Sequence, residues 1–262
     1  MDSNDGNRFV DFFKEGKYVL LKNYLYNYLI RKRAIEKCLQ QESPTLILEV
    51  GSGISPVVTK FRRVVYSDLS YEAVKILKQT QKTGYYVVAD GMHLPFKSSG
   101  FSHIICSEVL EHLENDLKAL KEMARTLKKP AGNLIVTVPH RKCYFTNDDY
   151  FVKHHRRYEI SEIKYRLRIS GLDPVQTQKV LGAIEKVTMI LVVFLITIIQ
   201  KHRPDKKKVK NGWNFRFVTL FAFLFKWMNL FYQGYVWVDA KIMPLSFCSV
   251  ILIKSIPLKT RL

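Results

Sequence analysis

The sequence contains few cysteines, glycines and prolines for its length. Its 262 residues include 4 cysteines, 12 glycines and 9 prolines. These fractions exclude a collagen, a low-complexity disordered chain and a disulfide-stabilised miniprotein. No two cysteines form a C-x-x-C pair, which favours free thiols in a reducing compartment and gives no metal site. The four positions are Cys38, Cys106, Cys143 and Cys248.

Acidic residues are scarce in the second part of the chain. The whole sequence carries 42 lysines and arginines against 23 aspartates and glutamates, a formal net charge of +19. Residues 151–262 hold 20 basic and 6 acidic side chains, whereas residues 1–150 hold 22 and 17. This asymmetry predicts an anionic partner for the second part, such as nucleic acid, a phospholipid surface or an acidic substrate. The segment Met1–Asp5 is acidic and polar, unlike a signal peptide, so we expect a cytoplasmic protein.

The spacing of apolar residues changes along the chain from a helical to a strand-like pattern. Residues 8–40 have helical spacing, with Leu25 and Leu29 on one stripe. Five short, nearly continuous apolar runs follow, and a helical stripe from Leu110 to Leu127 separates the last two. The runs are Thr45–Val50, Arg63–Asp68, Tyr85–Asp90, Phe101–Ser107 and Asn133–Pro139. Such runs are typical of strands buried on both faces, so the pattern predicts an α/β fold with a parallel sheet.

An apolar insertion interrupts this alternation at residues 181–245. Before it, the sequence predicts a helix capped by Ser161 and a strand at Pro174–Val180. A further β-rich run, Ser246–Ile256, follows the insertion and would complete the sheet. The sequence thus predicts three units. These are an N-terminal helical segment (residues 1–42), a discontinuous α/β domain (residues 43–180 and 246–262) and a helical insertion (residues 181–245).

The strongest local signal for function is a glycine-rich turn after the first predicted strand. The turn passes through Gly51 and Gly53 into a helix, and such glycines let the backbone approach a nucleotide-like ligand closely. Asp68 ends the next strand, nineteen residues after Glu49, where a carboxylate suits a pair of ribose hydroxyls. Pro56 stands where a dinucleotide-binding fingerprint has its third glycine, which argues against NAD and FAD.

Several blocks in this region resemble class I S-adenosylmethionine-dependent methyltransferases in order and spacing. The glycine turn and Asp68 look like the first two motifs of that family, and three later blocks look like its third, fourth and fifth strands. The blocks are Glu49–Gly53, Asp68, Val88–Phe96, Phe101–Leu113 and Leu127–Pro139. The resemblance covers about residues 45–140. It implies a Rossmann-like, doubly wound sheet, mostly parallel with an antiparallel last strand, plus the N-terminal helix and the helical insertion before that strand.

The same resemblance implies S-adenosylmethionine as the cofactor and assigns site residues. It places Glu49, Gly51 and Gly53 near the methionine part and Asp68 at the ribose. It places Asp90 and Met92 at the adenine and Glu108 at the rear of the pocket. Ser55 departs from the family pattern, because many members have a third glycine at that position.

A second segment is similar to a G-H-x-R-R-Y motif in a subset of these methyltransferases, several of which accept lipid-linked or glycan-related substrates. Lys153 replaces the glycine, and the matching residues are His154, Arg156, Arg157 and Tyr158. We expect these four side chains to bind the acceptor, since guanidinium groups fit phosphate and carboxylate. His154 is also a candidate general base, and His112 is a second catalytic candidate. The alternative is a basic loop that caps a helix.

The insertion predicts contact with a membrane surface. Its charge-free segments, Val187–Ile199 and Phe217–Phe225, are shorter than the roughly 20 residues that span a bilayer. A spanning hairpin would also place the connector Gln200–Arg216, with seven basic residues, on the far side, against the positive-inside tendency. We therefore expect a peripheral or monotopic protein on the inner face of a membrane, with two helices in the interface and the connector on anionic head groups. The alternative is a soluble helical lid.

These patterns predict a methyltransferase that acts on an oxygen, nitrogen or carbon of a lipid or lipid-linked acceptor. The cofactor loses its positive charge in the transfer, so no metal is expected. Two rival interpretations are an RNA or small-molecule methyltransferase with a soluble lid, and a noncatalytic membrane-binding protein that keeps the fold. Nucleic acid is disfavoured because Ser107–Leu110 stands where an Asn/Asp-Pro-Pro-Tyr/Phe motif for base binding would follow the fourth strand.

Overall fold

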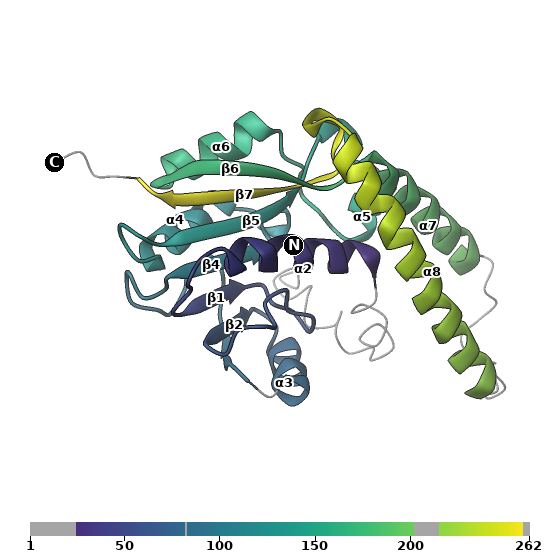
Figure 1. Cartoon of the computed structure of the whole chain (residues 1–262), viewed down its shortest axis with the longest axis horizontal. Helices are drawn as coiled ribbons and strands as arrows, with labels where there is room; N and C mark the ends of the chain where they lie inside the picture. Colours follow the sequence, from purple (N-terminus) through teal and green to yellow (C-terminus); the bar gives the residue numbers. More distant parts are fainter. Residues whose placement is uncertain (1–24, 82, 202–214, 259–262) are drawn as a thin grey trace, which may run out of the picture.

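A computed structural model describes residues 25–81, 83–201 and 215–258 (Figure 1). Its centre is one seven-stranded sheet with the order β3-β2-β1-β4-β5-β7-β6. The strands are β1 Ile47–Val50, β2 Val64–Asp68, β3 Tyr85–Val88, β4 His103–Ser107, β5 Asn133–Pro139, β6 Leu172–Leu181 and β7 Val250–Pro257. β1 to β5 pair in parallel, whereas β7 runs antiparallel to both β5 and β6. The α/β sheet with an antiparallel last strand is the predicted fold.

The central strands are buried on both faces, which explains their continuous apolar sequence. All four residues of β1 are buried, and parallel pairing sets Val50 beside Cys106 of β4 and Cys106 beside Val136 of β5. Side chains alternate between the two faces of the sheet and pack into two apolar clusters. One cluster includes Leu120 of α4, and the other includes Leu39 of α2.

Helices cover both faces of the sheet (Figure 1). Outside the insertion, those in the described part of the chain are α2 Tyr26–Gln40, α3 Tyr71–Thr80, α4 Asp116–Thr126, α5 Asn147–Phe151 and α6 Ile160–Ile169. α4 and α6 pack into one apolar cluster, and α2 and α3 pack into the other. The helix predicted at residues 8–40 is described from Tyr26 onwards, and residues 8–24 lie outside the described part.

Two predicted helix boundaries are wrong. The stripe Leu110–Leu127 is a short 3-10 helix, η2 (Leu110–His112), followed by a break and then α4. The break arises because the Asn115 side chain accepts a hydrogen bond from a backbone N–H of the next turn and starts a new helix. Ser161 does not cap α6, because the cap position is occupied by Glu159, which makes no side-chain cap bond.

The insertion between β6 and β7 forms two long helices that lie side by side, α7 (Ala183–Lys201) and α8 (Phe215–Ile242) (Figure 1). We call them the α7–α8 hairpin. At its base the two helices are joined to each other, since Asp239 of α8 accepts a hydrogen bond from the Ile184 N–H of α7 at 3.0 Å. The hairpin contacts the domain through Tyr232 of α8, whose ring packs edge-on against Tyr26 of α2 at 4.9 Å. From this base the helices extend away from the sheet (Figure 1). Most of the connector Gln200–Arg216 lies outside the described residues.

No helix in the described ranges combines the length and the apolar character needed to cross a membrane. The boundaries of the three predicted units, at residues 42, 180 and 245, stay predictions.

Candidate functional site

The carboxyl ends of the parallel strands bring the predicted cofactor residues to one edge of the sheet. Gly51 and Gly53 follow β1 and have φ values of +71° and +55°, in the left-handed region that favours glycine. A Cβ on Gly51 would lie 2.3 Å from Cγ2 of Val109, so no larger residue fits there without rearrangement. The N–H groups of Gly51 and Ser52 donate to the Ser67 carbonyl at 2.8 and 3.0 Å, which holds the turn against β2.

Two aspartates stand at the tips of the next strands. Asp68 ends β2, and its carboxylate accepts hydrogen bonds from the N–H groups of Gly53 at 2.8 Å and Ser70 at 2.9 Å. Asp90 follows β3, and its Oδ1 accepts from the Met92 N–H at 2.8 Å. The fold therefore gathers Asp68, Asp90 and Met92 at the edge that carries the glycine turn. Their contacts with a cofactor stay predictions.

Glu49 lies beneath this turn rather than beside a ligand space. Its buried carboxylate accepts hydrogen bonds from the N–H groups of Val57 at 2.7 Å and Val58 at 3.0 Å. Burial raises the pKa of Glu49 to about 8, although the two hydrogen bonds favour the ionised form. Both oxygens hold the loop that follows the turn. Glu49 therefore positions the backbone of this loop, and its approach to the methionine part stays a prediction.

Glu108 follows β4 and is joined to an arginine that sequence analysis missed. Its Oε2 lies 3.1 Å from Nη1 of Arg31 on α2. Its Oε1 is buried and has no hydrogen-bond partner among the described residues. In the sequence, Arg31 stands out only as a member of the basic run Arg31–Arg33, near the end of the N-terminal helical stripe. Helical periodicity alone could not direct one member of that run toward the sheet edge.

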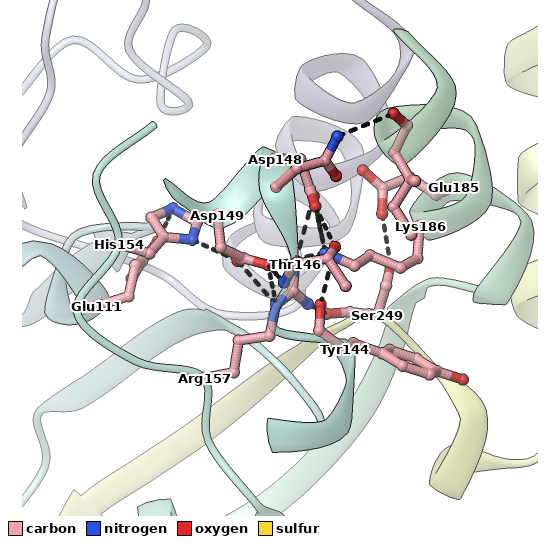
Figure 2. Close-up of polar contacts among 12 residues, drawn as sticks. Glu111, Tyr144, Thr146, Asp148, Asp149, His154, Arg157, Glu185, Lys186 and Ser249 are labelled. Atoms are coloured by element: carbon pink, nitrogen blue, oxygen red, sulfur yellow. Dashed lines mark hydrogen bonds and ion pairs between the residues drawn. The ribbon is translucent and has the colours of Figure 1, made fainter. Parts of the chain in front are cut away.

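A second polar cluster lies where α5 meets the base of α7 (Figure 2). Fully buried Asp149 lies 2.8 Å from each of three nitrogens, Nε of Arg157, Nζ of Lys186 and Nδ1 of His154. Asp148 accepts two more bonds from the Lys186 ammonium, at 2.6 and 2.8 Å. Burial by itself raises the pKa of Asp149, but these hydrogen bonds hold it well below its ordinary value. Because Lys186 belongs to α7, the cluster joins the hairpin to the domain.

The residues matched to the G-H-x-R-R-Y segment are mostly paired within the protein. Arg157 is buried in the cluster just described, and fully buried Tyr158 donates its hydroxyl to Asp116 at 2.7 Å. The polar atoms of these two side chains are thus used in the interior, and their binding of the acceptor stays a prediction that these contacts do not support. Arg156 is half-buried, donates to the Glu114 carbonyl at 2.9 Å and lies 3.4 Å from Asp116. Its charge is thus balanced within the chain, and its acceptor role stays a prediction.

His154 faces two residues of η2. Its Nε2 lies 3.8 Å from Oε1 of Glu111, and its ring centroid lies 4.7 Å from that of His112. Glu111 is fully buried, and burial together with the negative charge of Glu108 raises its pKa well above the ordinary value. Sequence analysis missed Glu111, although it follows Glu108 by three residues and precedes His112. Ligand atoms of Glu111, His112 and His154 lie within 4.8 Å of one another, a spacing at which they could hold a metal ion.

Comparison with known sequences connects the sheet edge to methyl transfer. Residues 48–136 match the methyltransferase domain family. An uncharacterised protein of Methanocaldococcus jannaschii is 30% identical over 181 residues, which cover 67% of this chain and 76% of that protein. A probable tRNA methyltransferase 9B of Bos taurus is 30% identical over 108 residues, 40% of this chain and 24% of that protein. The match thus spans about a quarter of the bovine relative.

Solved structures with a similar fold are more distant in sequence. A SAM-dependent methyltransferase from Thermotoga maritima has a TM-score of 0.59 at 17% identity and covers 95% of this chain and 96% of its own. A methyltransferase in complex with the Haloferax volcanii Trm112 activator has a TM-score of 0.59 at 15% identity, covering 94% and 95%. Phosphoethanolamine N-methyltransferase 2 of Haemonchus contortus, bound to S-adenosylmethionine, has a TM-score of 0.55 at 16% identity, covering 87% and 52%.

Proposed function

The chain belongs to the class I S-adenosylmethionine-dependent methyltransferases, and from that premise we propose that it methylates a lipid or lipid-linked acceptor at the surface of an anionic membrane. The enzyme class and the cofactor follow from the family. The acceptor and the membrane are the proposal, and they are supported by the surface of the α7–α8 hairpin.

The residues at the sheet edge fit the cofactor. S-adenosylmethionine supplies a methyl group activated by its sulfonium sulfur. The left-handed backbone at Gly51 and Gly53 forms a tight turn at the end of β1, which suits a ligand that approaches the backbone closely. The Asp68 carboxylate offers two acceptor oxygens for the ribose hydroxyls, and Asp90 with Met92 is proposed for the adenine. Arg31, 3.1 Å from Glu108, offers a cation near the same edge for the carboxylate of the methionine part.

Beside this edge, the chain would bind and orient the acceptor. We place the reacting group of the acceptor next to His112 and His154, whose rings meet edge-on. His112 follows the end of β4, and His154 follows α5. The His154 ring is held by Asp149, so its position is set by the fold before an acceptor arrives. Alignment of the reacting atoms and exclusion of water would supply most of the acceleration, because methyl transfer is an in-line displacement.

Exposed apolar side chains along the α7–α8 hairpin are the observation that carries the membrane part of the proposal. Val187, Leu191 and Phe194 of α7 are 56%, 56% and 55% exposed, and spacings of four and three residues place them on one face. Exposed apolar residues on α8 are Trp227, Leu230, Phe231, Tyr235, Trp237, Val238 and Ile242. Such a surface is unfavourable in water but suits a lipid interface, where Trp and Tyr are enriched.

Vesicle binding by a double variant tests this proposal. Leu191→Ser with Phe194→Ser should partition at least tenfold more weakly than wild type onto vesicles of phosphatidylserine and phosphatidylcholine, since each side chain buried in lipid contributes about 1.5–3 kcal/mol. Tyr165→Ser, at a similarly exposed residue on α6, is the matched control and should bind as wild type does. Equal binding by all three proteins, or none by wild type, would refute membrane contact. Radiolabelled methyl groups should be recovered in the organic phase of a lipid extract, and recovery only in water-soluble products would refute the lipid acceptor.

An RNA methyltransferase is the second candidate. The net charge of +19 and the similarity to a probable tRNA methyltransferase favour it. In that case the exposed face of the hairpin would cover the site or contact a protein partner. Salt-sensitive RNA binding without vesicle binding would favour this candidate over the first.

A further inference from the structure

Glu111 has an environment that is unusual for a carboxylate in a protein interior. The side chain is fully buried, and neither carboxylate oxygen has a hydrogen-bond partner among the residues that the structure describes. The Nε2 atom of His154 is 3.8 Å away, beyond hydrogen-bond distance. A buried carboxylate without a partner costs several kcal/mol, so this arrangement calls for a positive charge at that place.

His154 directs its Nε2 atom toward this carboxylate. Its Nδ1 lies 2.8 Å from Oδ1 of Asp149, which stays ionised because Arg157 and Lys186 also bind it. An ionised carboxylate only accepts hydrogen bonds, so Nδ1 carries a proton and Nε2 is the ring atom that can bind a metal ion. A carboxylate that fixes the tautomer of a histidine in this way is the usual outer partner of a metal-bound imidazole.

His112 supplies a third donor group. It follows Glu111 in η2, and its ring meets the His154 ring at 69° with 4.7 Å between centroids. Ligand atoms of the three residues lie within 4.8 Å of one another. Metal–ligand bonds of about 2.0–2.2 Å place two ligands of one ion roughly 3–4.4 Å apart, so small side-chain adjustments would close the set around an ion.

We propose that Glu111, His112 and His154 bind one divalent transition-metal ion, with Asp149 orienting His154 from outside the coordination sphere. Two imidazoles and one carboxylate favour Zn²⁺ or Mn²⁺ over Ca²⁺ and Mg²⁺, which prefer oxygen ligands. Glu108 adds a second negative charge close enough to act on Glu111, which further favours a cation there. This site departs from the sequence-based expectation of no metal, which rested on the cysteine pattern and on the charge change of methyl transfer.

Three protein ligands leave open positions on the ion, as in catalytic metal sites. A consequence that rests on the proposed function is that the acceptor carries a hydroxyl group. A hydroxyl that takes an open position has a lowered pKa and releases its proton to water. The acceptor oxygen then forms the bond to the methyl carbon while the carbon–sulfur bond breaks and its electron pair stays on sulfur. The acceptor class is therefore a hydroxyl-bearing molecule that is O-methylated.

Metal titration of the full chain tests the site. After treatment with a chelator, wild type should bind one equivalent of Zn²⁺ or Mn²⁺ in calorimetry, and Mg²⁺ should bind more weakly. Glu111→Gln and His112→Asn should each lower metal affinity by about 100-fold or more, at least as much as the loss of an outer-shell partner costs. His155→Gln, at the exposed neighbouring histidine, should leave the affinity unchanged.

Three measurements separate the outcomes. Substitution with Co²⁺ should give a visible absorption band that disappears in Glu111→Gln and persists in His155→Gln. S-adenosylmethionine affinity, measured separately, should be equal in all variants, which shows that they are folded and that the cofactor site is independent. Absence of Zn²⁺ and Mn²⁺ binding to wild type, or equal affinity in Glu111→Gln, would overturn the metal site and would favour a protonated His154 between two carboxylates. Normal metal binding without vesicle binding would instead refute only the proposed membrane function.

Discussion

Two buried carboxylates stand on opposite sides of the His154 ring, and their surroundings differ sharply (Figure 2). Asp149 pairs with Arg157 and Lys186 and orients Nδ1 of the ring. Glu111 faces Nε2 and, within the described residues, neither of its carboxylate oxygens has a hydrogen-bond partner. Both groups are fully buried, so the difference lies in the supply of positive charge and not in exposure to water.

This difference separates a group that serves the fold from a group that is available to a ligand. The cations around Asp149 come from the segment after α5 and from α7, so the cluster fastens the hairpin to the domain. Removing any member leaves an opposite charge buried with less compensation. Glu111 makes no comparable side-chain bond in the described part of the protein, so its removal breaks no hydrogen-bonded ion pair. The two carboxylates should therefore respond to substitution with opposite signs.

The largest effect is expected for Asp149→Asn. The change removes the carboxylate that binds both Arg157 and Lys186 and leaves only Asp148 beside them, so it should lower the free energy of unfolding by about 3–5 kcal/mol. Because the pKa of Asp149 is held below its ordinary value, its contribution is present in full above about pH 4 and is lost as the pH falls further. Urea denaturation at pH 7 measures the loss. Glu114→Gln, at an exposed acid nearby, should change stability by less than about 0.5 kcal/mol.

Lys186→Met should have a smaller effect of the same sign, about 2–3 kcal/mol, because Arg157 still compensates Asp149. Methionine keeps the apolar volume of the lysine stem, so the loss reports the charge. Hydrogen exchange of the α7 backbone should also accelerate, since the bond between the hairpin and α5 is broken. Lys121→Met on exposed α4 surface is the control, and equal effects of the two variants would contradict a role for the cluster in docking the hairpin.

The fold was largely predictable because strand burial leaves a direct trace in sequence. The run Asn133–Pro139 is β5 residue for residue, and the glycine turn lies at the end of β1 as expected. The turn and Asp68 could be located because their roles depend on the backbone and on a strand tip, both of which are local features. The antiparallel pairing of β7 followed from the family resemblance and not from periodicity.

Charge pairing between distant segments could not be predicted in the same way. Arg157 resembled a substrate-binding residue because sequence shows its neighbour Arg156, whereas its partner Asp149 is identified only by the fold. Lys186 reaches the same carboxylate from 37 residues away on another helix. Glu111 was visible in the sequence, but the absence of a partner at its oxygens, within the described residues, depends on three-dimensional packing. A residue's type and spacing indicate its chemistry, and only its surroundings decide whether that chemistry is already used.

The smallest expected effect, and the one with the opposite sign, is that of Glu111→Gln. In metal-free protein, burial and the charge of Glu108 raise the pKa of Glu111, so the folded state binds a proton more tightly than the unfolded state. The free energy of unfolding then falls by about 1.4 kcal/mol for each pH unit above about 4.5, until the pH passes the raised pKa.

The glutamine variant lacks this titration, so metal-free Glu111→Gln should be about 1–2 kcal/mol more stable than metal-free wild type at pH 7. Added Zn²⁺ should reverse the order, because it stabilises only the protein that binds it. Urea denaturation from pH 5 to pH 8, with and without Zn²⁺, measures both effects. A variant that is less stable than wild type in the absence of metal would mean that Glu111 is satisfied within the fold, and the contrast with Asp149 would then no longer hold.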